Sequence, residues 1–173
     1  LEVRALALKQ GEKNFLLVQF DLITVNEVVY LKLRKAIADL AQFNDGNIIF
    51  TATHTHTAPD INPTSNGSNP EYTDFAVAQA AAAIRDAVKN MRAGELATGL
   101  TGDKRFEFNR RYWMKDGSVV TNPGKLNPKI VRPEGAVDYD IPLAALCVNG
   151  KVEVLLANIV NHTDTTGGSG VSA

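Results

Sequence analysis

Residues 15–52, FLLVQFDLITVNEVVYLKLRKAIADLAQFNDGNIIFTA, contain the pattern that decides the fold. The stretch opens with an apolar run at residues 15–22 and closes with a short, bounded apolar run at residues 47–52, and both runs are typical of strands. Between them, apolar residues recur at helical intervals, namely Val29, Leu33, Ile37 and Leu40. A strand, a helix and a strand over this length predict a parallel βαβ crossover and therefore an α/β fold.

Local signals indicate where the helix of this unit begins and ends. Thr24 and Glu27 have the spacing of a capping box, so we expect the helix to begin there. Gly46 is a typical C-terminal stop and predicts the end of the helical region.

Outside this unit, the N-terminal half continues with a hairpin and a second helix. Residues 3–8 and 15–22 flank the turn-like sequence at residues 11–14, which predicts a β-hairpin. A polar loop over residues 53–70 is followed by a helix from about Glu71 to about Met91, with Pro70 near its first turn. The expected buried stripe of this helix consists of Val77, Ala81, Ile84, Val88 and Met91.

The C-terminal part is predicted to be rich in strands. A strand is expected at residues 95–101, and two further strands at 141–148 and 152–159 are joined by Asn149-Gly150, the preferred pair for a type I′ turn. Residues 102–136 show little periodicity, so we expect a long loop that is either functional or disordered. The predicted fold class is α/β, a mixed β-sheet with a parallel βαβ crossover and flanking helices, plus a C-terminal β-hairpin.

Composition excludes several classes of protein. The net charge of −1 and the pI of about 6.3 provide no overall basic field for nucleic acid, although a local patch is compatible with that average. The single Cys147 lies in an apolar run and is expected to be a buried hydrophobic residue, not a catalytic thiol. No apolar run reaches the 18–20 or so residues of a membrane-spanning helix. Since the chain begins with Leu1, we expect it to be a piece of a longer protein.

All three histidines follow predicted strands. His54 and His56 come directly after the strand at 47–52, and His162 follows the apolar run at 154–160. In open α/β sheets, ligands bind beyond the carboxyl ends of strands. On an extended backbone two residues apart, His54 and His56 would point to the same side. Such a pair can chelate one ion, or supply one ligand and one acid–base group, unless the histidines are simply structural loop residues.

Zinc is the expected metal, because imidazole suits it and hydrolytic zinc sites keep a coordination position open for water. Two imidazoles are too few for a stable catalytic site, so further ligands are required. Asp21, at the end of the second strand, is a candidate ligand or a partner for the second nitrogen of a histidine. Its alternative role is that of a residue at the entry to the first helix.

Several segments in the same order resemble the neutral/alkaline non-lysosomal ceramidases and their bacterial relatives. Residues 50–59, FTATHTHTAP, resemble the family segment A-T-H-T-H-S-G-P. Residues 18–22 resemble its V-x-x-D-L strand end, and residues 108–111 resemble its x-N-R motif. Residues 161–165 resemble its x-H-x-T segment, and residues 171–173 resemble the start of its I-S-A-D segment.

The resemblance implies that residues 1–173 are the N-terminal part of a single zinc-hydrolase catalytic domain. It implies that His54 and His162 bind zinc, that His56 beside the metal is catalytic, and that Arg110 lines the site. The remaining zinc ligands of the family, a glutamate and a tyrosine, lie beyond the end of this sequence. Arg111 replaces the serine that follows N-R in the ceramidases, which is more typical of a bacterial branch than of a sphingolipid enzyme.

The function expected from this resemblance is zinc-dependent hydrolysis of an N-acyl amide bond in a small-molecule or lipid substrate. The location implied by the family is extracytoplasmic, either secreted or periplasmic. Two alternatives stay open. One is a hydrolase of the same fold that acts on a different amide or ester, such as a cell-wall or carbohydrate-linked compound. The other is a binding domain without catalytic activity.

Overall fold

The computed structural model describes residues 1–162 and 170–171, and the chain divides into two compact units. The first unit contains residues 1–92 and the described residues from His162 onward, and the second contains residues 93–161. The prediction that residues 1–173 belong to one catalytic domain is not tested by this division and stays a prediction.

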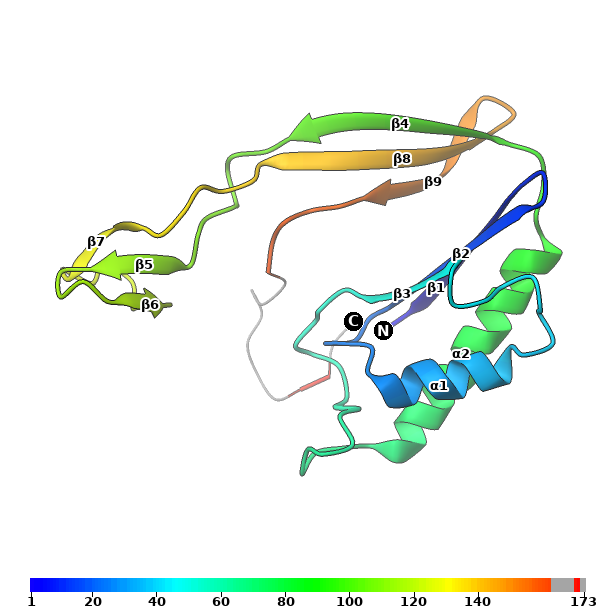
Figure 1. Ribbon diagram of the computed structural model, residues 1–173, viewed down its shortest axis with the longest axis horizontal. Helices are drawn as coiled ribbons and strands as arrows, with labels where there is room; N and C mark the ends of the chain where they lie inside the picture. The colour runs from blue at the N-terminus through cyan, green and yellow to red at the C-terminus, as the bar shows by residue number, and fades with distance from the viewer. Residues whose placement is uncertain (163–169, 172–173) are drawn as a thin grey trace. The chain divides into compact units, whose positions relative to one another are not determined.

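The first unit is built on a three-stranded sheet with the order β1-β2-β3 (Figure 1). Strands β1 (Val3–Gln10) and β2 (Lys13–Phe20) pair antiparallel, and Gly11 in their turn has a left-handed φ of 57°. Strand β3 (Ile48–Ala52) pairs parallel with β2. The predicted hairpin, the parallel crossover and the mixed sheet are therefore confirmed.

Helix α1 (Glu27–Ala36) connects β2 and β3, but both of its ends differ from the prediction. The N-cap is Asn26, whose Oδ1 accepts a hydrogen bond of 3.0 Å from the Val29 N–H, and not Thr24. The Asn26 amide also donates to the Ile61 carbonyl at 2.9 Å, so this one side chain both caps the helix and fastens a distant loop. The expected end at Gly46 is wrong, because the helix ends at Ala36 and the chain continues in turns that bury Phe43.

Helix α2 (Pro70–Lys89) follows the polar loop, as predicted. Asn69 caps it by accepting a 2.9 Å hydrogen bond from the Tyr72 N–H, and Pro70 occupies the first turn, where its missing N–H costs nothing. The last member of the predicted stripe, Met91, lies beyond the helix and is exposed, because the helix stops two residues earlier.

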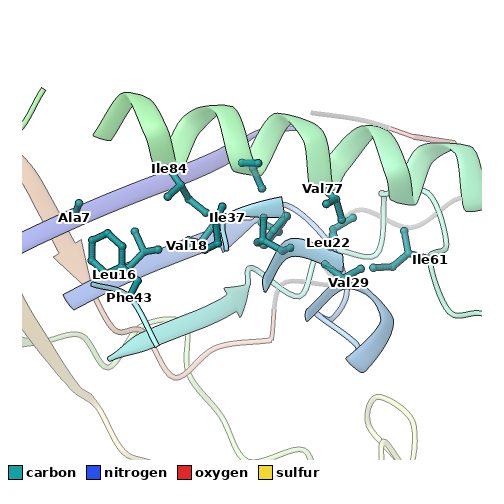
Figure 2. Packing of buried hydrophobic residues seen from close by; sticks show 14 residues of the cluster. Ala7, Leu16, Val18, Leu22, Val29, Ile37, Phe43, Ile61, Val77 and Ile84 are labelled. Carbon is teal, nitrogen blue, oxygen red and sulfur yellow. The ribbon is translucent and has the colours of Figure 1, made fainter. Parts of the chain in front are cut away.

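The core of the first unit lies between the sheet and both helices (Figure 2). Alternate residues of β2, namely Leu16, Val18 and Phe20, are almost fully buried, as period-two patterning requires. Val29 and Leu33 of α1 and Val77, Ala80 and Ile84 of α2 join the same cluster. Because both helices contribute to one cluster on one set of strand residues, they cover the same face of the sheet.

The second unit contains two antiparallel sheets. Strands β4 (Glu95–Gly102), β8 (Asp140–Val148) and β9 (Lys151–Ala157) form a sheet with the order β4-β8-β9. Asn149 and Gly150 between β8 and β9 have φ values of 51° and 74°, as a type I′ turn requires at both central positions. This confirms the predicted C-terminal hairpin.

The second sheet of this unit corrects the prediction of a long loop at residues 102–136. Strands β5 (Arg111–Met114), β6 (Val119–Thr121) and β7 (Ile130–Pro133) form a sheet with the order β6-β5-β7. Strands of three or four residues are too short to produce a recognisable alternation, so hydrophobic periodicity missed them. No helix within the described part of the chain is long and apolar enough to cross a membrane.

The core of the first unit allows a matched test within α1. Leu33 is fully buried, whereas Leu31 on the same helix is 57% exposed. We expect Leu33→Ala to lower the free energy of unfolding by about 2–5 kcal/mol, because it removes buried methyl groups and leaves a cavity. The control Leu31→Ala should change it by less than about 0.5 kcal/mol. Urea denaturation followed by circular dichroism measures both, and equal effects would contradict the packing described.

Candidate metal centre

The β2–β3 pairing brings the first two histidines to the carboxyl end of the sheet. The Thr53 N–H donates to the Phe20 carbonyl at 2.9 Å, so the parallel pairing continues one residue past β3. His54 therefore starts from a backbone that is fixed to the neighbouring strand. This is the edge at which ligands of open α/β sheets gather.

The backbone at His54 is not extended, contrary to the prediction. Its φ is 61°, in the left-handed region, which is uncommon for a residue other than glycine and costs about 1–2 kcal/mol. The rings of His54 and His56 nevertheless meet, with their centroids 5.0 Å apart and nearly perpendicular. The convergence therefore comes from a local turn and not from strand alternation. Outliers of this kind concentrate at functional sites.

His162 completes the cluster from a position more than one hundred residues later in the sequence. Its ring centroid lies 4.9 Å from that of His54 and 5.0 Å from that of His56. One ring nitrogen from each histidine lies within 4.8 Å of the others. His54 and His56 are exposed and His162 is half-buried, so the cluster is open to solvent. The predicted convergence of the three histidines is thus present within the first unit.

A main-chain carbonyl orients the ring of His54. Its Nδ1 lies 2.7 Å from the carbonyl oxygen of Ile23, in the turn between β2 and α1. A carbonyl oxygen can only accept, so Nδ1 carries a proton, and in the neutral ring the lone pair is therefore on Nε2. Metal-binding histidines are typically oriented in this way by a hydrogen bond from the other ring nitrogen. The sequence could not reveal this contact, because every residue has a carbonyl group.

The donor set fits a zinc ion. Imidazole nitrogens bind zinc at about 2.0–2.1 Å, so two ligands of a tetrahedral ion lie roughly 3.3 Å apart. The ligand nitrogens of the cluster are within 4.8 Å, and small rotations of the exposed His54 and His56 rings would close that difference. His54 and His162 can serve as ligands, and His56 can serve as a third ligand or as an acid–base group beside the metal.

Asp21 makes contacts that connect β1 to the end of β2. Its Oδ2 accepts a 2.9 Å hydrogen bond from the Glu2 N–H, and its Oδ1 accepts one of 3.3 Å from the Arg4 guanidinium. Its charge also contributes to raising the pKa of Tyr72, although burial of that phenol is the larger cause. These contacts give Asp21 an anchoring role, and its predicted role beside the metal stays a prediction.

Arg110 belongs to the second unit, and its predicted role at the metal site stays a prediction. Its carbonyl accepts a 2.9 Å hydrogen bond from the Asn122 N–H, which fixes the backbone just ahead of β5. The neighbouring Asn109 caps the same turn, since its Oδ1 accepts from the Arg111 N–H at 2.9 Å. Arg111 forms a two-pronged ion pair with Glu134, which lowers the pKa of that carboxyl.

The orientation of His54 can be tested in the absence of metal. We expect ¹⁵N NMR of the metal-free protein at about pH 8 to show His54 as the Nδ1–H tautomer, because the Ile23 carbonyl accepts that proton. Long-range ¹H–¹⁵N correlation spectra distinguish the protonated ring nitrogen from the one with a lone pair. His56 in the same spectrum is the internal comparison. An Nε2–H tautomer at His54 would show that the carbonyl does not orient the ring.

Asp21→Asn separates the two roles of Asp21. Because the carboxylate contacts Glu2 and Arg4, we expect the free energy of unfolding to fall by about 1 kcal/mol and the zinc affinity to stay within about threefold. Urea denaturation and zinc titration measure the two quantities. A loss of zinc affinity of about 10–100-fold would instead support the predicted role beside the metal.

Comparisons with known proteins show which solved structures have a similar fold. A scan against protein-family models and a search of curated proteins return no match. Among solved structures, a ceramidase complexed with C2 has a TM-score of 0.62 and 19% identity over 84% of this chain. The neutral ceramidase from Pseudomonas aeruginosa has a TM-score of 0.60 and 20% identity over 83% of this chain. The chain spans 23% of the length of each of these structures. At this identity the comparison establishes that the chain has a ceramidase-like fold over most of its length.

Proposed function

We propose that this chain forms the zinc-binding part of a ceramidase-like hydrolase that cleaves N-acyl amide bonds. The observation that supports the proposal most strongly is the convergence of His54, His56 and His162, whose ligand nitrogens lie within 4.8 Å of one another. The likeness of the fold to two ceramidase structures is independent support, because it does not depend on the histidines. The proposed location is extracytoplasmic.

His54 and His162 would hold the zinc ion. A zinc ion held there would supply a bound water of lowered pKa and would polarise the carbonyl of the scissile amide. The Ile23 carbonyl keeps the proton of His54 on Nδ1, so Nε2 is available as a ligand without a change of tautomer. The left-handed backbone at His54 directs this ring toward the other two.

His56 would move protons beside the metal. Its ring is exposed and lies about as far from His54 as from His162, with centroid distances of 5.0 Å to each. An imidazole can take a proton from an attacking water and return one to the leaving amine at neutral pH. Arg110 would stabilise the negative charge that develops on the carbonyl oxygen, as guanidinium groups do in acyl transfer.

The zinc site has a direct test. We expect the purified full-length protein, which would supply the remaining ligands, to bind close to one zinc ion per chain by elemental analysis after zinc loading and desalting. His54→Ala and His162→Ala should each reduce this to near zero, because each removes a ligand. His56→Ala should keep the zinc and lose hydrolysis at least 100-fold, as expected for a proton-transfer group.

A control variant and the contrary outcomes distinguish the zinc site from the assigned role of each histidine. Gln79→Ala, on the exposed part of α2, should retain full zinc content. Loss of zinc from His56→Ala would show that all three histidines are ligands and would contradict the division of roles. If the unchanged protein binds no zinc, the alternative of a binding domain without catalytic activity would be favoured. A panel of N-acyl amines, carboxylic esters and N-acylated amino sugars, tested with the zinc-loaded protein, then distinguishes the amidase from a hydrolase of other substrates.

A further inference from the structure

The loops of the β5–β6–β7 sheet, in the second unit of the chain, carry basic and apolar residues. We define the lysine tip as Lys115, Lys125, Leu126 and Lys129, on the loops that connect the three strands. From Arg111 to Pro133 the sequence has five basic residues and one acidic residue, although the whole chain has a net charge of −1. The average composition therefore conceals a concentrated positive region, as such charge asymmetry can.

The positive charge of the tip comes from its lysines. Arg111 is paired with Glu134, and the guanidinium of Arg132 lies 5.5 Å from the centroid of the Trp113 ring. In contrast, none of the three tip lysines forms an ion pair within the described part of the chain.

The one acidic side chain of this sheet does not cancel that charge. Asp116 accepts hydrogen bonds from Ser118, at 2.9 Å from its N–H and 2.6 Å from its hydroxyl. These bonds lower the pKa of Asp116, with a smaller contribution from Lys129. Asp116 is the one acidic residue between Arg111 and Pro133, so this segment keeps a net positive charge.

The lysines lie on a well-defined framework. The Lys115 N–H donates to the Lys129 carbonyl at 2.9 Å, which holds the two loops together. Both residues line one open hollow of about 540 Å³, together with Val120. Asn127 fixes the β6–β7 loop, because its amide donates to the Pro123 carbonyl at 2.7 Å and its Oδ1 accepts from the Lys129 N–H at 3.0 Å. Lys115 and Lys129 therefore share one surface, and Lys125 and Leu126 lie on the loop that Asn127 fixes.

The side chain of Leu126 does not contribute to the packing of the fold. It is 98% exposed, so it contributes no packing, and its φ of 55° is a left-handed conformation that favours glycine or asparagine. Leu126 therefore presents an exposed aliphatic side chain directly beside Lys125, the combination of apolar and basic groups that interfacial segments present to a lipid surface.

We propose that the lysine tip binds the surface of an anionic lipid bilayer. Leu126 would enter the boundary between headgroups and acyl chains, while Lys115, Lys125 and Lys129 would contact the acidic headgroups. A lipid surface fits better than a nucleic acid. An aliphatic side chain gains free energy by entering hydrocarbon, whereas it cannot hydrogen-bond to a base edge or a phosphate. The proposal does not depend on the zinc site or on the hydrolase activity.

Vesicle sedimentation tests the proposal with the whole chain. We expect binding to vesicles of phosphatidylcholine with 30% phosphatidylserine, little binding to phosphatidylcholine alone, and weakening at high salt. Lys125→Glu combined with Lys129→Glu should weaken binding at least about 25-fold, since each lysine near an anionic surface contributes about fivefold. Leu126→Asn should weaken it about tenfold, and it suits the left-handed backbone, so misfolding would not explain the loss.

Matched substitutions on the other sheet of the same unit are the controls. Lys151→Glu and Val152→Thr change an exposed lysine and an exposed apolar residue at the start of β9, and both should leave binding within about twofold. Equal binding to neutral and anionic vesicles, no binding to either, or equal losses in tip and control variants would overturn the proposal. Binding of a duplex oligonucleotide in place of vesicles would also overturn it and would identify a nucleic-acid surface.

Discussion

The parallel pairing of β2 with β3 is the constraint on which the candidate site depends. The register places Phe20 opposite Ala52, and the hydrogen bond from Thr53 to Phe20 extends it to the last residue before His54. The turn after β2 and the turn after β3 therefore leave the sheet side by side. This is why the Ile23 carbonyl, 31 residues earlier in the sequence, can reach the ring of His54. Alternate residues of β2 are buried under both helices, and this burial stabilises the strand pairing. The packing of the core therefore fixes the position of the site.

Long periodic segments and strong turn signals were predictable from the sequence. Local sequence patterns are sufficient to predict the apolar runs of β2 and β3, the buried stripe of α2 and the Asn149-Gly150 turn. The predictions failed where two local signals competed. Thr24 and Asn26 can both cap a helix, and Asn26 prevails because its amide also bonds to Ile61, a tertiary contact that no local pattern contains. The short strands β5–β7 failed for a different reason, since three or four residues cannot establish a period.

The candidate site was predictable in its residues but not in its geometry. The spacing of His54 and His56 after a strand, and the strand-like run before His162, indicated that the three could meet. The expected reason, side chains alternating along an extended backbone, was wrong, because His54 turns into the left-handed region. Strand geometry alone places two residues on the same side of a sheet, but it does not direct their rings toward a third group from a distant segment. A left-handed residue changes the direction of the chain within one step and makes that convergence possible.

The exposure of the histidine rings and the hydrogen bond to Ile23 determine how far the side chains must move to bind a metal ion. The exposed rings of His54 and His56 have room to rotate, and the ligand nitrogens lie within 4.8 Å of one another, compared with the roughly 3.3 Å that separates two ligands of a tetrahedral zinc ion. His54 moves against a fixed hydrogen bond to Ile23, so its rotation is limited to small angles about that contact. The exposed ring of His56 therefore has more room to adjust than that of His54. If His56 stays outside the coordination shell, its imidazole remains beside the metal, where proton transfer needs it. The cluster brings three imidazoles within reach of one ion, and their proposed division into two ligands and one acid–base histidine stays a prediction.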